Sequence, residues 1–337
     1  MKGLMKFLTV LIIIISIVSC ELIPNEHQHD FSEGQIIKNA TCSESGEILY
    51  TCSCLMTKSE IITPLGHVFG EWVIEKEATY SDSGIKHRIC TCGAKERVVV
   101  DKLMPVFEEN FDGAELNRKN WSLCPEWIRH DGGSIWNNKM TSLDGEGHLV
   151  LRAEWDDANG RVKCGAIRSK GLFEYGYGYY EASIKFPVAP GIWGAFWINC
   201  GNIQLVDGSA ADGVEIDVIE SIYNEKGYFN AALHWDGYDS AHKSVNTGHL
   251  SDCDIYDGNF HLFAVERNER GYIFYIDGIV IWRVYSYSCA PCPELGFLEL
   301  SLEGTYEVGA GTEASLKALP AEMLVDYVKV YEKNPYK

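Results

Sequence analysis

Most of the chain, from about residue 105 to residue 332, consists of short segments in which apolar and polar residues alternate. Alternation with a period of two is typical of strands that bury one face, because successive side chains on a strand point to opposite sides. Glycine, aspartate and asparagine separate the segments, and Asp277-Gly278 between two apolar runs is typical of a two-residue hairpin turn. The pattern predicts an all-β protein, with a jelly-roll β-sandwich as its main domain.

The beginning of the chain has the features of an export signal. Lys2 and Lys6 precede an apolar run that is too short to favour a permanent membrane span. The run ends at Ser19 and Cys20, which resembles the lipobox of bacterial lipoproteins, where the cysteine becomes the lipidated N-terminus. We therefore expect residues 1–19 to be a lipoprotein signal peptide. A lipid on Cys20 is expected to anchor an exported protein to the membrane of the bacterial cell envelope.

Residues 20–104 contain a sequence that occurs twice at an offset of 38 residues. Ala40-Thr-Cys-Ser-Glu-Ser-Gly46 corresponds to Ala78-Thr-Tyr-Ser-Asp-Ser-Gly84, and His29, Cys52 and Cys54 correspond to His67, Cys90 and Cys92. Self-similarity at one fixed period indicates duplicated modules, and their composition favours short strands. We expect two small β-rich modules that act as a spacer, with carbohydrate binding as the alternative role.

The paired cysteines of these modules permit two interpretations. Their thiolates and His67 are zinc-type ligands, but C-x-C is not the commoner C-x-x-C spacing of zinc sites. Disulfides are the alternative in an exported chain, although Cys42 has Tyr80 as its counterpart and the number of cysteines is odd. We therefore expect disulfides in the modules, and zinc is the less favoured interpretation.

One expected strand carries three carboxylates within six residues, Glu215, Asp217 and Glu220. Glu215 and Asp217 share a face, whereas Glu220 falls on the opposite face of a regular strand. One β-bulge between Asp217 and Glu220 returns Glu220 to the first face, with its Cα atom roughly 13 Å from that of Glu215. Side chains that lean together there bring their carboxyl groups to about 5–5.5 Å, the separation found in retaining glycosidases. A solvated acidic strand face is the alternative.

Five motifs around these carboxylates resemble glycoside hydrolase family 16 over residues 105–333. They are Ala166-Ile-Arg-Ser-Lys170, Tyr177-Gly-Tyr-Tyr-Glu-Ala182, Gly191-Ile-Trp-Gly-Ala-Phe-Trp197, Ala232-Leu-His-Trp235 and Val325-Asp-Tyr-Val-Lys-Val-Tyr331. The resemblance implies a concanavalin-like jelly roll with a cleft on its concave face. It also implies retaining hydrolysis by double displacement, with Glu215 as nucleophile, Asp217 as assisting carboxyl and Glu220 as general acid/base. The bulged spacing resembles that of laminarinases, agarases and carrageenases.

The resemblance and the charge also suggest the ligands. Trp193, Trp197 and Trp235 are candidates for stacking on sugar rings, with packing in the core as the alternative. His234 is a candidate for contact with the nucleophile region or a sugar hydroxyl, with a hydrogen-bonded structural histidine as the alternative. The net charge of −19 excludes nucleic acid as a partner and disfavours sulfated galactans. We expect a monomer that hydrolyses β-1,3- or mixed β-1,3/1,4-glucan internally. A β-galactan hydrolase of the agarase or carrageenase type and a non-catalytic glycan-binding lipoprotein are the alternatives.

The implied chemistry needs no cofactor, but the resemblance suggests a structural metal. Many members of the family bind one calcium ion on the convex side, through the first strand and an aspartate of the last strand. Asp326 matches that aspartate. The first-strand match, Phe107-Glu-Glu-Asn-Phe111, has Asn110 where a glutamate is usual, which weakens the expected site.

Overall fold

The computed structural model describes residues 28–129, 133–222, 227–306 and 311–337. The expected signal peptide and Cys20 lie outside these residues. No helix within the described ranges is long and apolar enough to cross a membrane. The described chain forms two compact units. One runs to residue 75 and includes residues 85–98, and the other comprises residues 76–84 and 99–337.

Each sequence repeat folds as a three-stranded sheet, in agreement with the expected β-rich modules. The strands are β1 (Gly34–Lys38), β2 (Gly46–Thr51) and β3 (Thr57–Ile62) in the first repeat, and β4 (Val73–Lys76), β5 (Gly84–Ile89) and β6 (Lys95–Val100) in the second. Across residues 28–104, Cys52 and Cys90 are the buried apolar side chains. The repeats therefore have almost no hydrophobic core of their own.

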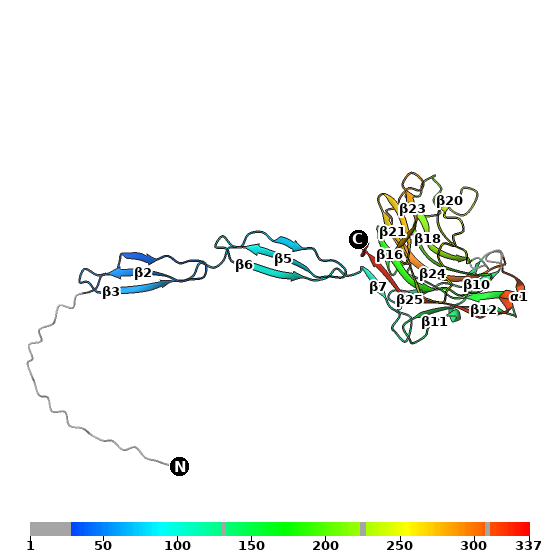
Figure 1. Ribbon diagram of the computed structural model, residues 1–337, viewed down its shortest axis with the longest axis horizontal. Coiled ribbons are helices and arrows are strands. Elements are labelled where there is room, and N and C mark those ends of the chain that lie inside the picture. The colour runs from blue at the N-terminus through cyan, green and yellow to red at the C-terminus, as the bar shows by residue number, and fades with distance from the viewer. Residues whose placement is uncertain (1–27, 130–132, 223–226, 307–310) are drawn as a thin grey trace, which may run out of the picture. The chain divides into compact units, whose positions relative to one another are not determined.

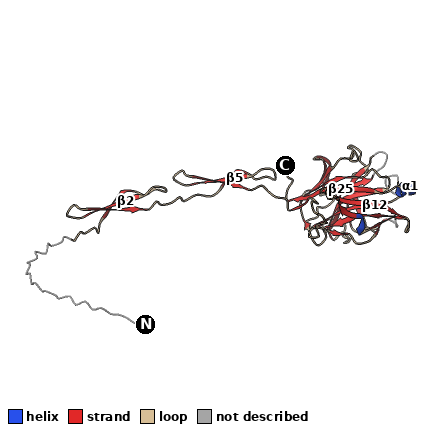
Figure 2. Cartoon of the chain, turned by 90° about the horizontal axis from the view of Figure 1, so that it is seen from below, coloured by secondary structure: helices blue, strands red, loops and turns tan. Residues whose placement is uncertain are grey.

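The large unit contains two sheets, and Figures 1 and 2 show that its regular secondary structure consists almost entirely of strands. In spatial order, the first sheet consists of β23 (Ile279–Tyr285), β22 (Gly271–Ile276), β21 (His261–Asn268), β16 (Gly178–Lys185), β25 (Ala321–Tyr331), β12 (Leu149–Asp156), β13 (Arg161–Cys164), β10 (Ser134–Trp136) and β9 (Ile128–Arg129). β7 (Phe107–Glu109) pairs with β25, and β11 (Thr141–Leu143) pairs with β12.

The second sheet has the order β20 (Lys243–Asn246), β19 (Phe229–Trp235), β18 (Gly213–Ile222), β17 (Ile192–Gly201), β24 (Gly296–Gly304), β14 (Ala166–Arg168) and β8 (Ser122–Leu123). β15 (Glu174–Tyr175) pairs with β24. The helical turns η2 (Asn138–Met140) and α1 (Glu313–Lys317) complete the described elements. The predicted all-β sandwich is thereby confirmed.

The hairpin predicted at Asp277-Gly278 is confirmed between β22 and β23. Asp277 has φ 51° and Gly278 has φ 78°, and positive φ at both central positions is what a type I′ turn requires. The backbone twist of this turn matches that of the strands it joins, so two residues suffice to reverse the chain. The meander expected from Phe260 to Val284 is therefore β21, β22 and β23.

The hydrophobic core lies between the two sheets and sets the faces of the second one. On β24, Leu298, Leu300 and Leu302 are each 0% exposed and belong to this core. The residues that alternate with them, Glu299 and Ser301, line a cleft instead. The pleat of the strand thus assigns apolar side chains to the core and polar side chains to the opposite face.

Candidate active site

The outer face of the second sheet carries a cleft of about 1080 Å³. Its central side chains come from three neighbouring strands, β17, β18 and β24: Trp193, Trp197, Glu215, Asp217, Glu220, Glu299, Ser301 and Glu303. On the other side of the same strands, Ile198, Ile216 and Leu300 are completely buried in the core. The structure therefore brings the three predicted carboxylates into one concave site.

An irregularity in β18 places the third carboxylate. The pairing of β18 with β19 shifts between Asp217 and Glu220. Against β17, Phe196 pairs with Ile219 and the next residue pairs with Asp217, so Val218 is the extra residue. Val218 and Ile219 are both buried, at 1% and 0% exposure. The predicted bulge is confirmed, and it returns Glu220 to the face of Glu215 and Asp217.

Asp217 occupies the middle of the site. Its Oδ2 lies 3.3 Å from Nε2 of His234, and ligand atoms of Glu215, Asp217 and His234 all lie within 4.8 Å of one another. Burial raises the pKa of Asp217 well above its ordinary value, and the charge of Glu215 raises it further. A carboxylate close to a buried carboxyl group makes the ionisation of that group less favourable. Asp217 therefore holds its proton more tightly than an exposed aspartate does.

Glu215 receives a hydrogen bond that the sequence did not predict. The Tyr238 hydroxyl donates to Oε2 of Glu215. Burial raises the pKa of Glu215 above its ordinary value, and this hydrogen bond and the charge of His234 limit the rise. His234 also forms a hydrogen bond with His242, at 2.9 Å between Nδ1 and Nε2. Tyr238 and His242 follow β19 in the chain. Their closeness in sequence to His234 is the one feature that could have predicted them as residues of the site.

Glu220 is arranged to keep its proton. It is 9% exposed, and burial together with the charge of Asp217 raises its pKa to about 8. Asn230 opposes this effect, because its Nδ2 donates a hydrogen bond of 2.5 Å to Oε2 of Glu220 and favours the ionised form. A general acid must hold its proton at neutral pH, and a pKa of about 8 gives Glu220 that property.

Replacing Asn230 by alanine is expected to shift the basic limb of the pH–activity profile upward. Asn230 stabilises the carboxylate form of Glu220, so its loss raises the pKa of Glu220 above its value of about 8. One hydrogen bond is worth about 1 kcal/mol, which corresponds to a shift of roughly 0.7 pH units. The pH dependence of kcat/KM measures it. The control is Asn246→Ala, which changes an exposed residue on β20. A basic limb that stays at the same pH or moves to lower pH in Asn230→Ala would contradict Glu220 as the general acid.

The predicted aromatic residues divide between the cleft and the core. Trp193 and Trp197 line the cleft, and Nε1 of Trp197 donates to Oγ of Ser301 at 3.2 Å. Trp235 is 7% exposed and belongs to the core cluster. It follows His234 on β19, so it points away from the cleft, and its assignment to sugar stacking is wrong. Trp127 lines the cleft with 54% exposure and was missed.

Strand β24 adds acidic groups outside the E-x-D-x-x-E motif. Glu299 and Glu303 line the cleft, and burial raises the pKa of Glu299 to about 7. Glu303 forms an ion pair with Arg129, at 2.7 Å between Oε1 and Nε. The alternation of polar and apolar residues from 297 to 303 could have revealed both glutamates. Their presence makes the cleft rich in carboxylates.

The residues around Asp326 give no support to the expected calcium site. Oδ2 of Asp326 accepts a hydrogen bond of 3.3 Å from Ser183. Among the described residues, Asp326 belongs to none of the close groups of three or more His, Cys, Asp and Glu side chains. Glu109 of the first strand instead accepts hydrogen bonds from Phe111 N and from Asn120. Calcium stays a prediction, and the chemistry of the cleft does not depend on it.

Comparison with known proteins identifies the domain that contains this site. Residues 130–295 match the family model described as "Glycosyl hydrolases family 16". The chain carries a glycosyl hydrolase family 16 domain. The matched segment includes Glu215, Asp217 and Glu220, so the site described above lies within it.

Three similar proteins illustrate the range of this domain. Glucan endo-1,3-beta-glucosidase A1 of Niallia circulans is 24% identical over 68% of this chain and 38% of its own length. A laminarinase structure from Flavobacterium sp. UMI-01 is 26% identical, with a TM-score of 0.54 over 68% of this chain and 100% of the other. A protein described as a pseudo beta-1,3-glucanase of Mycobacterium tuberculosis is also 26% identical, with a TM-score of 0.54 over 68% and 99%. The chain thus spans about two fifths of the curated Niallia relative.

Proposed function

We propose that the family 16 domain is a retaining, endo-acting β-glucan hydrolase. The observation that carries this proposal is the bulge at Val218, which returns Glu220 to the face that holds Glu215 and Asp217. Retaining glycoside hydrolysis needs a nucleophilic carboxylate and a protonated carboxyl group, and the cleft holds Glu215 and Glu220 on one wall. The pseudo-glucanase among the similar structures makes a non-catalytic glycan-binding protein the alternative.

In the first step, an oxygen of Glu215 attacks the anomeric carbon, and Glu220 gives its proton to the departing sugar oxygen. This step forms a glycosyl ester on Glu215 and leaves Glu220 ionised. Glu220 then takes a proton from water, whose oxygen attacks the anomeric carbon and releases Glu215. Asp217 assists from the middle of the site, where its carboxyl group raises the pKa of Glu220 and helps that residue to keep its proton before the first step. Each step inverts the anomeric centre, so the product keeps the β configuration of the substrate.

The substrate class follows from the charge of the chain. Its formal net charge at pH 7 is −19. This negative charge repels sulfated chains and is indifferent to neutral ones. We therefore favour β-1,3-glucan or mixed β-1,3/1,4-glucan, with Trp193 and Trp197 as surfaces for sugar rings. A neutral β-galactan such as agarose is the second candidate.

Anchoring at the bacterial cell envelope is also a proposal. Its support is the sequence that precedes Cys20, where Lys2 and Lys6 and an apolar run end in a lipobox-like Ser19-Cys20. A lipid on Cys20 would hold the hydrolase close to the membrane, while the repeats separate the family 16 domain from it in sequence. This arrangement suits the degradation of polysaccharide outside the membrane. We propose a monomer, since the three carboxylates come from one strand.

Hydrolysis of a polysaccharide panel tests the function. The full chain is incubated with laminarin, mixed-linkage glucan, agarose and carrageenan, and the products are separated by chromatography. We expect oligosaccharides of several lengths from the glucans early in the reaction, as endo-cleavage requires. NMR of the first product should show the β-anomer. Initial release of the α-anomer would contradict the retaining mechanism, and binding to glucan without cleavage would establish the non-catalytic alternative.

A further inference from the structure

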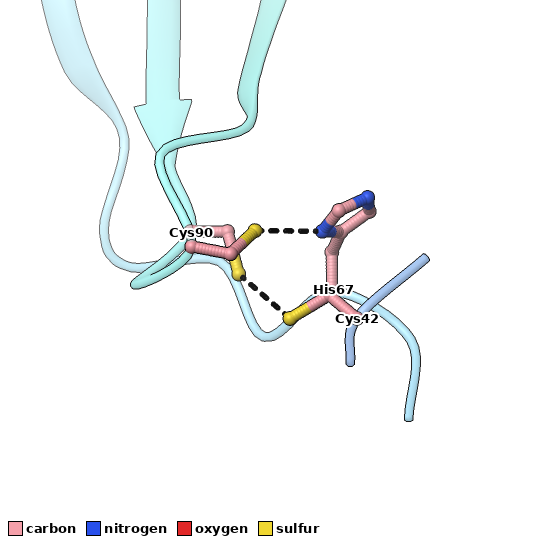
Figure 3. Close-up of side chains that lie close together, drawn as sticks. Cys42, His67 and Cys90 are labelled. Carbon is pink, nitrogen blue, oxygen red and sulfur yellow. Dashed lines mark hydrogen bonds between the residues drawn. The ribbon is translucent and has the colours of Figure 1, made fainter. Parts of the chain in front are cut away.

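The two repeats hold a second group of reactive side chains. Cys42, His67, Cys90 and Cys92 offer ligand atoms that all lie within 4.8 Å of one another, and Figure 3 shows the side chains converging. The sulfurs of Cys42 and Cys90 are 3.8 Å apart, and the Cys92 sulfur is 3.3 Å from Nδ1 of His67. All four residues lie in one compact unit. We propose that they bind one Zn²⁺ ion through three thiolates and a neutral imidazole.

The distances agree with tetrahedral zinc. Zinc–sulfur bonds of about 2.3 Å and zinc–nitrogen bonds of about 2.0–2.1 Å give tetrahedron edges of roughly 3.8 Å between sulfurs and roughly 3.5 Å between sulfur and nitrogen. The separations of Cys42 from Cys90 and of Cys92 from His67 are close to these edges. A disulfide needs two sulfurs at about 2.05 Å. The cysteines of the cluster are all unbridged, so the arrangement favours a metal site over the disulfides expected from the spacing.

The first repeat contains the same three ligands from within one module. His29, Cys52 and Cys54 offer ligand atoms within 4.8 Å of one another, and Nδ1 of His29 is 3.1 Å from the Cys54 sulfur. These residues correspond to His67, Cys90 and Cys92 at the repeat offset. The duplication therefore reproduces the ligand geometry as well as the ligand types. A chance approach of side chains would not be expected to occur at equivalent positions of both sheets.

The origin of the fourth ligand explains the odd cysteine. Cys42 belongs to the first repeat, whereas the other three ligands belong to the second. A module thus contributes its cysteine to the site of the module that follows it. The counterpart of Cys42 is Tyr80, which has no third repeat after it. Tyr80 instead packs edge-to-face against Tyr331, with ring centroids 4.8 Å apart.

The repeats also need a source of stability other than a core. Ile36, Ile61, Ile74 and Val99 are more than half exposed, at 55%, 77%, 58% and 66%. Three short strands that bury so little apolar surface are not expected to fold stably without a cross-link. A structural zinc ion supplies that cross-link, because its binding energy becomes folding energy. The ion would order the second repeat and join it to the first.

Zinc analysis of the full chain tests the proposal. The chain is purified without chelators, and bound zinc is counted by mass spectrometry of the metal. Cys90→Ser/Cys92→Ser is expected to hold about one zinc ion fewer than the unchanged chain. Cys42→Ser, which removes one ligand of four, is expected to bind zinc at least about 100-fold more weakly in competition with a chelator. Cys253→Ser, which changes a cysteine in the other unit, is the matched control.

Alkylation of the cysteines in the unchanged chain tests the same site without relying on a variant that folds. Cysteines are alkylated with and without zinc, and the modified peptides are mapped by mass spectrometry. Zinc should protect Cys42, Cys90 and Cys92 together, whereas Cys253 should react equally in both samples. Equal reactivity of the cluster with and without zinc would overturn the proposal. A Cys42–Cys90 disulfide in the isolated chain would overturn it as well.

Discussion

Glu215→Ala is expected to lower the rate of glucan hydrolysis by on the order of 10⁵-fold, because no other group replaces the nucleophile. The truncated side chain leaves a space that the fluorine of an α-glycosyl fluoride can occupy. This donor resembles the missing covalent intermediate, so the variant should still transfer its sugar to the hydroxyl of a second sugar, with fluoride as the leaving group and Glu220 taking the hydroxyl proton. Product formation from laminarin and from the fluoride measures the two effects.

The control for this variant is a glutamate far from the cleft. Glu146→Ala removes an exposed carboxylate in the turn before β12 and should keep the normal rate. Circular dichroism of Glu215→Ala should retain the β spectrum, since Glu215 faces the cleft and its neighbour Ile216 carries the packing. Hydrolysis by Glu215→Ala within tenfold of the normal rate would exclude Glu215 as the nucleophile.

Glu220→Ala is expected to lower glucan hydrolysis by about 10²–10⁴-fold, which is the usual contribution of a general acid. An aryl glycoside with a good leaving group should still form the glycosyl-enzyme, because its departure needs no proton. Azide, which needs no general base, should then attack the ester and give a β-glycosyl azide. NMR of the azide product and the rate as a function of azide concentration measure this rescue.

The pH profile of Glu220→Ala gives a second test. With a pKa of about 8, Glu220 loses its proton as the pH rises, so hydrolysis by the unchanged enzyme should fall above roughly pH 8. That basic limb should disappear from the profile of the variant on the aryl glycoside. An α-glycosyl azide from Glu220→Ala would mean that the attacking anion had taken the place of the nucleophile. The roles of Glu215 and Glu220 would then be reversed.

Local sequence pattern was sufficient for the strands and for the three carboxylates. The parity of a strand assigns Glu215 and Asp217 to one face, and the apolar Val218-Ile219 pair before Glu220 requires an extra residue. The structure confirms this bulge in the pairing of β18 with both of its neighbours. The hairpin at Asp277-Gly278 was predictable for the same reason, since a turn depends on residues adjacent in the chain.

The alternation of side chains along a strand does not by itself show which face of β19 packs in the core. Trp235 and His234 are adjacent on β19, so one of them had to point away from the cleft. The sequence offered both as ligands, and the packing of the two sheets buries Trp235. The choice depends on which sheet covers the strand, and that partner comes from distant parts of the chain.

Local sequence pattern specifies the succession of strands along the chain, the acidic motif and the repeat with its Cys and His positions. Tertiary structure decides which groups form hydrogen bonds with the side chains of the cleft. Asn230 reaches Glu220 from β19, Tyr238 reaches Glu215 from a loop, and Ser301 meets Trp197 across 104 residues of sequence. It also brought Cys42 to the ligands of the next repeat. A sequence pattern specifies the face of the strand on which a side chain lies. The pairing of distant strands decides which groups contact that side chain, and burial among those groups shifts its pKa.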